Sequence, residues 1–332
     1  MKKTSLFSLV LILVLVLSVN SSVFASKVIN LGHTVATDSA YHKGALKFKN
    51  LVEERTNGEV TVQIFPQSQL GWERDMLEGL KLGSVDMCIS ATGPFAVFVP
   101  EFELLNFPFL FKNSEHLKWF MYESAAATKL KSVAEEKGFK VLAIGAPDFR
   151  VPFANKFLAE PSDFNGVKIR LMGVPIHRDT YNLLGANVTS MDFSELYSGL
   201  QMGVVDAAEN TYNATYAMKF YEVASHMTDL PVFANTNALV ISMKTYNSLS
   251  STEKEIVNQA GAEAWKYHDD ITLEMDNDGI EKMRAEGMNI KFDINLEPFI
   301  EKTEPIYNQY LEKLPDWVSE AVEDIRLNAE CF

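Results

Sequence analysis

Hydrophobic and polar positions in the first part of the chain follow a strand–helix–strand–helix–strand order. Val60–Phe65 alternates apolar and polar side chains as a half-buried strand does. Between His42 and Arg55, the apolar side chains recur near the 3.6-residue period of a helix. The pattern therefore predicts strands over residues 28–32, 60–65 and 85–90, and helices over residues 42–55 and 73–82. This alternation is typical of an α/β fold.

The rest of the chain continues the mixed pattern. It predicts strands over residues 141–144, 167–171 and 238–242, and helices over residues 179–184 and 194–202. The Phe-rich segment 104–111 is interpreted as a buried connector. Ser250-Ser251-Thr252-Glu253 forms a capping box that opens a helical pattern ending near Gly287. A helix of about 30 residues spans about 45 Å, which is longer than one lobe needs, so we expect this helix to brace two lobes.

One octapeptide pattern occurs twice. Residues 79–86 are GLKLGSVD and residues 199–206 are GLQMGVVD, so both copies follow G-L-x-x-G-x-V-D. In each copy we expect a helix to end at the second glycine, which tolerates a left-handed C-cap, and a buried strand to follow. The two copies predict two similar α/β lobes. A two-lobed α/β protein is a candidate clamp for a small ligand.

The N-terminus has the features of an export signal. Lys2 and Lys3 precede an almost wholly apolar stretch, Leu6–Val19, and a cleavage site follows at Val23-Phe24-Ala25. We therefore predict a signal peptide over residues 1–25, cleaved after Ala25, rather than a membrane anchor, and a soluble mature protein in the periplasm. Its loss would make the net charge of −14 two units more negative. Such acidity argues against binding to nucleic acid or to anionic lipid.

Catalytic and metal-binding motifs are absent from the sequence. There is no G-x-S-x-G, H-E-x-x-H, C-x-x-C, G-x-G-x-x-G or P-loop pattern, and the six histidines lack metal-ligand spacing. A disulfide between the two cysteines, Cys88 and Cys331, is not expected. We predict no metal, no cofactor and no enzymatic activity, although distant residues can assemble a catalytic triad.

Two arginines are the leading candidates for ligand contacts. Arg150 follows a strand-like run, and Arg170 lies inside an apolar strand in which Lys168, Arg170 and Met172 share one face. A guanidinium near the end of a strand in an α/β lobe faces the crevice at the edge of the sheet, where it can grip a carboxylate with two hydrogen bonds. A structural salt bridge is the alternative for Arg170.

The mature chain resembles the DctP-type solute-binding proteins of TRAP (tripartite ATP-independent periplasmic) transporters over residues 28–290. The resemblance rests on an ordered set of segments: Gly32-His33, residues 53–58 (EERTNG), 65–71 (FPQSQLG), 83–86 (GSVD), 108–111 (PFLF), 168–170 (KIR), 184–186 (LGA), 193–197 (FSELY), 203–206 (GVVD), Glu209-Asn210 and 219–223 (KFYEV). It implies a two-lobed periplasmic-binding-protein-like α/β fold with a hinge, a long helix bracing both lobes, and closure around an organic acid. Lobe I is expected over residues 26–147 and 236–275, and lobe II over residues 148–235 and 276–322.

The resemblance also implies the ligand contacts. Arg170 would pair with the ligand carboxylate as the main selectivity element. Further polar contacts would come from Arg150 and Asn210. An aromatic packing surface would come from Phe193, and Glu73 would reach ligand hydroxyls from the first lobe. His33 and Thr34, after the first strand, are weaker candidates.

Three positions depart from the family pattern. Thr211 follows Asn210 where proline is usual, and Ala91 stands where some sialate-binding relatives carry an acidic residue, which argues against sialate. Asp148 replaces a commoner glycine two positions before Arg150. Two roles are open for Asp148: it neutralises Arg150, or it accepts hydrogen bonds from ligand hydroxyls or an amine.

The candidate site is polar, which bears on the ligand class. Asp148, Glu73, Asn210 and Asn235 favour a hydroxylated monocarboxylate such as a uronate or an aldonate. A dicarboxylate such as malate or succinate is the alternative, with Arg150 holding the second carboxylate. The implied partner is a membrane permease driven by an ion gradient. A sensory binding protein that feeds a receptor is the first rival and an exported enzyme the second. We expect a monomer.

Overall fold

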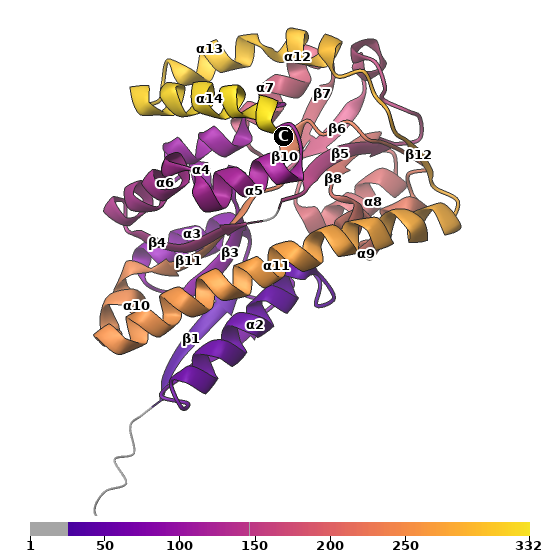
Figure 1. Ribbon diagram of the computed structural model, residues 1–332. Coiled ribbons are helices and arrows are strands. Elements are labelled where there is room, and N and C mark those ends of the chain that lie inside the picture. Colours follow the sequence, from indigo (N-terminus) through magenta and orange to yellow (C-terminus); the bar gives the residue numbers. More distant parts are fainter. Residues whose placement is uncertain (1–25, 146) are drawn as a thin grey trace, which may run out of the picture.

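The computed structural model describes residues 26–145 and 147–332. The predicted signal peptide and its cleavage site therefore lie outside the described residues, apart from Ser26 on the far side of the cut. The described chain forms two sheets in two lobes, and one long helix runs along both of them (Figure 1).

The first lobe is built on a mixed five-stranded sheet with the order β2-β1-β3-β11-β4. β1 pairs in parallel with β2 and β3, whereas β11 is antiparallel to both β3 and β4. The strands are β1 (Lys27–Gly32), β2 (Val60–Phe65), β3 (Met87–Ala91), β4 (Phe139–Gly145) and β11 (Asn237–Ser242). The helices of this part of the chain are α2 (Ala40–Arg55), α3 (Glu73–Leu82), α4 (Thr92–Ala96), the 3-10 helix η1 (Pro100–Asn106), α5 (Ser114–Glu123), α6 (Ala125–Glu136) and α10 (Met243–Ser248).

Both faces of this sheet are buried, which explains the nearly continuous apolar run of β11. Val240 packs into one core with side chains of α3 to α6, whereas its neighbours Leu239 and Ile241 pack into a second core with α2 and the long helix. Alternate side chains of a strand point to opposite faces, so a strand covered on both faces must be apolar throughout. The Phe-rich connector is buried as predicted, with Leu104, Phe107 and Phe111 in the first of these cores.

The second lobe carries a seven-stranded sheet with the order β12-β9-β5-β8-β6-β7, with β10 paired to β5. β6 is parallel to β7 and β8, and β5 is antiparallel to β8, β9 and β10. The strands are β5 (Phe149–Ala154), β6 (Lys168–Leu171), β7 (Asn187–Ser190), β8 (Ala207–Asn210), β9 (His226–Thr228), β10 (Phe233–Ala234) and β12 (Asn289–Lys291). The helices between them are η2 (Pro161–Phe164), α7 (Pro175–Leu184), η3 (Phe193–Glu195), α8 (Leu196–Gln201), α9 (Tyr212–Ala217) and η4 (Phe220–Glu222).

The repeated octapeptide forms the same turn in both lobes. Gly83 and Gly203 have φ angles of 73° and 70°, the left-handed conformation that glycine adopts without strain. In each copy the amide of the following residue donates to the carbonyl of the first glycine, over 2.9 Å. β3 and β8 then begin after the Val-Asp pair, so the predicted helix–turn–strand unit is confirmed in both lobes.

The long helix α11 (Ser251–Ala285) has 35 residues and packs against α2 in the first lobe and α9 in the second (Figure 1). Ser250 and Glu253 make both hydrogen bonds of the predicted capping box. At Gly279 the helix approaches α9 so closely that a Cβ atom would lie 3.2 Å from the backbone of Tyr212. The prediction of one bracing helix is confirmed.

Besides α11, two connections between described strands link the sheets, one from β4 to β5 and one from β10 to β11. The expected lobe boundaries after residues 147 and 235 lie in these two crossings. The chain ends with α12 (Glu297–Thr303), α13 (Pro305–Leu311), α14 (Asp316–Asn328) and η5 (Ala329–Cys331). Phe299 of α12 packs in a core of the second lobe, whereas Ile306 and Ile325 pack with α4 to α6.

The element bounds differ from the predicted ones mainly at helix starts. α7 begins at Pro175, where Pro occupies the first turn, and not at residue 179. The first residues of the helix predicted over 194–202 form a 3-10 turn, and the α-helix starts at Leu196. Among the described residues, no helix combines the length and the apolar character needed to cross a membrane.

Candidate ligand-binding site

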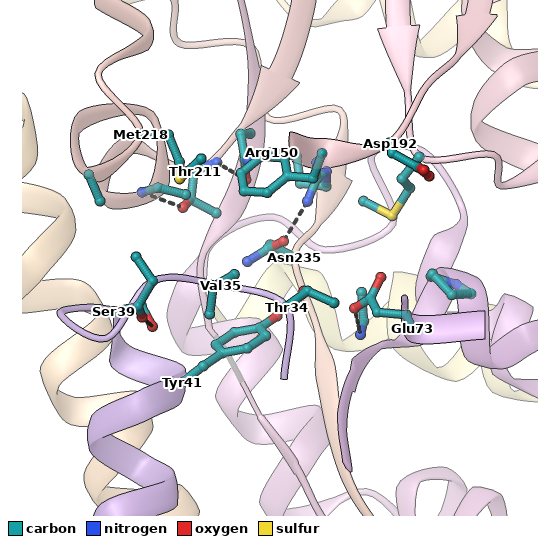
Figure 2. A pocket seen from close by; sticks show the side chains of 18 of the residues that line it. Thr34, Val35, Ser39, Tyr41, Glu73, Arg150, Asp192, Thr211, Met218 and Asn235 are labelled. Carbon is teal, nitrogen blue, oxygen red and sulfur yellow. Dashed lines mark hydrogen bonds between the residues drawn. The ribbon is translucent and has the colours of Figure 1, made fainter. Parts of the chain in front are cut away.

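A cleft of about 510 Å³ is lined by residues of both lobes and of α11. This volume falls within the range of roughly 300–1,000 Å³ that is usual for small-molecule sites. Figure 2 shows Tyr41 and Glu73 below the cleft, Arg150, Thr211 and Asp192 above it, and Asn235 between them.

Strand ends bring the polar side chains together. Ala91 ends β3, Ser190 ends β7 and Asn210 ends β8, and all three residues line the cleft. Because β6, β7 and β8 are parallel, their carboxyl ends meet at one edge of the second sheet. Open α/β sheets bind ligands at this edge.

Arg170 lies in β6 with Ile169 and Leu171 buried beside it and is itself only 3% exposed. Its Nε atom donates to the carbonyl of Met191 over 2.8 Å, and its Cζ atom lies 5.7 Å from the centre of the Phe193 ring. No carboxylate pairs with it among the described residues, and its two Nη groups have no hydrogen-bond partner there. Burial, followed by the positive charge of Arg150, lowers the pKa of Arg170 to about 10, so the group stays charged at neutral pH.

Arg150 has a different environment although it is equally buried. Its Nε atom forms an ion pair with the Glu209 carboxylate, and its Nη2 atom donates to the Glu209 carbonyl over 3.0 Å. Its Nη1 atom donates to Oδ1 of Asn235 over 2.8 Å. Burial lowers the pKa of Arg150, but the Glu209 carboxylate more than offsets this effect, and the net shift is upward. A structural salt bridge was the alternative role for Arg170, but among the described residues it is Arg150 that forms one, with Glu209.

Asp148 lines the cleft beside Arg150 but does not pair with it. The side chain is 3% exposed, and the Nδ2 atom of Asn235 donates to its two oxygens over 3.3 and 3.4 Å. Burial, followed by the negative charge of Asp276, raises the pKa of Asp148 well above its usual range. Glu209, and not Asp148, neutralises Arg150.

Glu73 is the first residue of α3, and its Oε1 atom accepts the amide of Ala91 over 2.8 Å. Burial raises its pKa, and the Ala91 hydrogen bond, Arg150 and Arg170 partly offset this rise. At the end of β8, Oδ1 of Asn210 accepts the amide of Thr211 over 2.9 Å. Phe193, Thr34, Asn210 and Asn235 also line the cleft, as the sequence predicts for contact residues.

The structure does not bring His33 to the cleft. His33 is fully buried, and its Nε2 atom lies 3.0 Å from Nδ1 of His42. Burial, followed by the charge of His42, lowers the pKa of His33 to about 4. His33 continues the inward face of β1 that Leu31 occupies, so the next residue, Thr34, faces the ligand space instead.

Sequence reasoning missed several residues that shape the site. Tyr41 lies at the start of α2 and projects its ring into the cleft. His268 and Thr272 of α11 also line the cleft. The only available signal for Tyr41 is its position in the first helical turn after β1. Glu209 was part of the recognised Glu209-Asn210 motif, but nothing local identifies it as the partner of Arg150. Among the described residues, no group of three or more His, Cys, Asp or Glu side chains is arranged to hold a metal ion.

Comparisons with known proteins show the family of this chain. Residues 31–314 match the family described as bacterial extracellular solute-binding protein, family 7 (DctP). The C4-dicarboxylate-binding periplasmic protein DctP of Rhodobacter capsulatus is 32% identical over 291 residues, which cover 86% of this chain and 87% of that protein. The sialic acid-binding periplasmic protein SiaP of Vibrio cholerae is 29% identical and covers 90% and 93%, respectively.

Solved structures agree over nearly the whole described chain. A TRAP periplasmic solute binding protein from Polaromonas sp. JS666 bound to D-erythronate has a TM-score of 0.86 and 29% identity, and covers 91% of this chain and 98% of that one. One from Sulfitobacter sp. NAS-14.1 with bound β-D-galacturonate has a TM-score of 0.86 and 26% identity, and covers 90% and 99%. The chain belongs to family 7 of the bacterial extracellular solute-binding proteins, the DctP family.

Proposed function

We propose that this protein captures a hydroxylated monocarboxylate, of the uronate or aldonate type, outside the cytoplasm and delivers it to a TRAP-type permease. The observation that carries the proposal is Arg170, a buried guanidinium in the cleft with no carboxylate partner among the described residues. A buried cation without a partner is costly, and a ligand carboxylate removes that cost. The proposal includes export of the chain by a signal peptide that is cleaved after Ala25.

One available cation favours one carboxylate. Arg150 is already neutralised by Glu209 and gives a further hydrogen bond to Asn235, whereas Arg170 keeps both Nη groups for the ligand. Glu73 and Asp148 add hydrogen-bond acceptors, which suit hydroxyl groups and offer no cation to a second carboxylate. The relatives that bind galacturonate and erythronate carry ligands of this class.

The expected affinity is consistent with these contacts. Each hydrogen bond to a charged group contributes about 1.5–3 kcal/mol, and a micromolar complex needs about 8 kcal/mol in total. Two hydrogen bonds from Arg170 with two or three to hydroxyl groups approach this value. A dicarboxylate is the second candidate, because a relative that is 32% identical binds C4-dicarboxylates and a solved relative from Shewanella oneidensis holds succinate.

A thermal-shift panel tests the proposal. The chain from Ser26 onward is heated with uronates, aldonates, dicarboxylates, keto acids and amino acids. A ligand at 100 times its dissociation constant adds about 2.7 kcal/mol, which raises the midpoint by several degrees. We expect the largest rise with a uronate or an aldonate and no chemical conversion of the bound acid. Turnover would favour the enzyme alternative, and a response to dicarboxylates alone would favour the second candidate.

The Arg170→Ala variant should keep its fold and lose the ligand-induced rise. Arg170→Lys should also bind poorly, because an ammonium cannot reproduce the two-pronged geometry of a guanidinium. Arg178→Ala is the matched control, since Arg178 is exposed and pairs with Asp179 outside the cleft. Micromolar binding by Arg170→Ala would refute the carboxylate clamp.

Experiments in cells distinguish delivery to a permease from a sensory role. Deleting a neighbouring permease gene should abolish uptake of the ligand if the protein serves transport. Loss of a ligand-dependent signal, with uptake intact, would favour a sensory role. Purified mature protein should elute as a monomer with and without ligand.

A further inference from the structure

Asp148 occupies an unusual position in the cleft. It lies where the chain crosses from the first sheet to the second, and it is almost fully buried although it lines the ligand space. The Nδ2 atom of Asn235, at 3.3 and 3.4 Å, is the only side-chain donor to Asp148 among the described residues. These distances exceed the usual 2.7–3.2 Å of an N–H···O hydrogen bond. The backbone amide of Asp148 itself is a further donor. A carboxylate has about four acceptor positions, so part of this capacity is left for a ligand.

The orientation of Asn235 is set by its other partner. Its Oδ1 atom accepts a hydrogen bond from Nη1 of Arg150 over 2.8 Å, so its amide nitrogen has to face Asp148. Arg150 is held in turn by Glu209. The contacts from Glu209 through Arg150 therefore turn the Asn235 amide toward Asp148 (Figure 2 shows the Arg150–Asn235 hydrogen bond). They bring no cation into contact with Asp148.

Among the described residues, no cation forms an ion pair with Asp148. On β5, Arg150 is engaged by Glu209, and on α11 both Asp276 and Asp269 raise the pKa of Asp148 through their negative charge. Asp269 accepts hydrogen bonds from Tyr122 and from Nδ1 of His268. Among the described residues, Arg170 forms no ion pair with Asp148. This part of the cleft is lined by acidic side chains and has no cation to pair with a second anionic group.

We propose that Asp148 is a specificity-determining residue that accepts hydrogen bonds from a donor group on the ligand and excludes a second carboxylate. The inference rests on the proposed function, in which Arg170 holds the single carboxylate of the ligand. The donor is a hydroxyl or an ammonium group, which share this chemistry. Asp148 thus separates sugar acids and amino-substituted acids from dicarboxylates.

Calorimetry with Asp148→Asn and Asp148→Gly tests the inference. The probes are D-galacturonate and succinate, and the readout is the ratio of their dissociation constants. We expect both variants to weaken galacturonate binding about 10-fold or more, since a hydrogen bond to a charged group is lost, and to strengthen succinate binding. The exposed Asp38, outside the cleft lining, provides the matched control Asp38→Asn, which should leave the ratio unchanged.

The outcomes separate the inference from the proposed function. An equal loss for both probes would show that Asp148 only supports Arg150 and would overturn the inference, as would an unchanged ratio. If the wild-type protein binds no carboxylic acid, the proposed function is refuted as well. The same holds if Arg170→Ala binds carboxylic acids as tightly as the wild-type protein does. Both variants should keep the wild-type melting temperature or exceed it, because they remove a buried carboxyl group whose only side-chain hydrogen bonds, from Asn235, are long.

A matched pair of ligands identifies the donor. D-gluconate and D-glucosaminate differ by one hydroxyl replaced by an ammonium group. A larger loss for gluconate in Asp148→Asn assigns a hydroxyl, and a larger loss for glucosaminate assigns an ammonium. No loss for either ligand, with wild-type binding intact, would contradict the role of Asp148.

Discussion

The two buried arginines of the cleft differ in their partners. Arg150 and Arg170 have similar exposure, but only Arg150 has a carboxylate partner, Glu209, among the described residues. The antiparallel pairing of β5 with β8 places Arg150 next to Glu209, which is 59 positions away in sequence. A buried cation with a fixed partner stabilises the lobe, whereas one without a partner is available for a ligand. Residue type and alternation identified both arginines but did not separate these roles.

Asp276 gives a pH prediction at the residue scale. It lies on α11 and accepts hydrogen bonds from the backbone amide and Nδ2 of Asn213, over 2.8 and 2.6 Å. Burial raises the pKa of Asp276 to about 6. Because the folded state binds the proton more tightly than the unfolded state, the stability from this group is present below about pH 4 and is lost as the pH rises through about 6.

Asp276→Asn should flatten this part of the pH profile. In urea unfolding, the free energy of unfolding of the wild-type protein should decline between pH 4 and pH 7. In the variant, this decline should be smaller by about 2 kcal/mol. Asp278→Asn is the control, because Asp278 is exposed and pairs with Lys282 one turn away. An unchanged decline in Asp276→Asn would show that Asp276 is not the titrating group.

At the scale of elements, local signals specified the helices and turns with the clearest caps. The capping box at Ser250 and Glu253, the glycine turns at Gly83 and Gly203, and the alternation of β2 all correspond to observed elements. Helices α5, α6 and α12 to α14 were not predicted. Their apolar side chains become interpretable only where they pack, as Ile306 and Ile325 do against α4 to α6.

The N-cap of α11 can be tested directly. Ser250→Ala removes the hydrogen bond that the Ser250 hydroxyl accepts from the amide of Glu253. The free energy of unfolding should fall by about 1 kcal/mol, the usual cost of losing such a cap. Ser251→Ala, at the exposed first helical position, is the matched control and should have little effect. Equal losses in the two variants would point to a general effect of the substitution rather than the cap.

At the scale of the whole molecule, the cleft belongs to neither lobe alone. Glu73 and Tyr41 come from the first lobe, Arg170 and Asn210 from the second, and His268 from the helix that braces both. A ligand that contacts both lobes favours the arrangement in which they are close, and it shifts the population by its differential affinity. Under the proposed function, we therefore expect capture and closure to be one equilibrium.

Hydrogen exchange would reveal this coupling. A bound acid should slow exchange of backbone amides in both residues 33–41 and residues 208–216, which approach the cleft from different lobes. The distal helix α14 should change little. Arg170→Ala, exposed to the same ligand, should show no protection. Protection confined to one lobe would contradict closure around the ligand, even if binding itself were confirmed.

Local pattern and family resemblance together named much of the lining of the candidate site. Strand alternation indicated Arg170, whereas the resemblance implied Glu73 and Asn210, and all three line the cleft. The sequence also named His33, which the structure places in the core against His42, and it did not name Tyr41. One position along a strand reverses the face that a side chain occupies, so small errors at strand ends move residues between core and cleft.

The sequence by itself determined the two α/β lobes, the bracing helix, the repeated glycine turns and the family. Periodicity, caps and motifs each depend on residues that are close along the chain, so they can be recognised without the tertiary structure. Only the tertiary structure decided that Glu209 neutralises Arg150, that Arg170 has no carboxylate partner among the described residues, and that Asp148 faces the cleft beside Asn235. These contacts join residues 59, 85 and 87 positions apart. Charge pairing depends on distance in space and on burial, and neither is encoded in spacing along the chain.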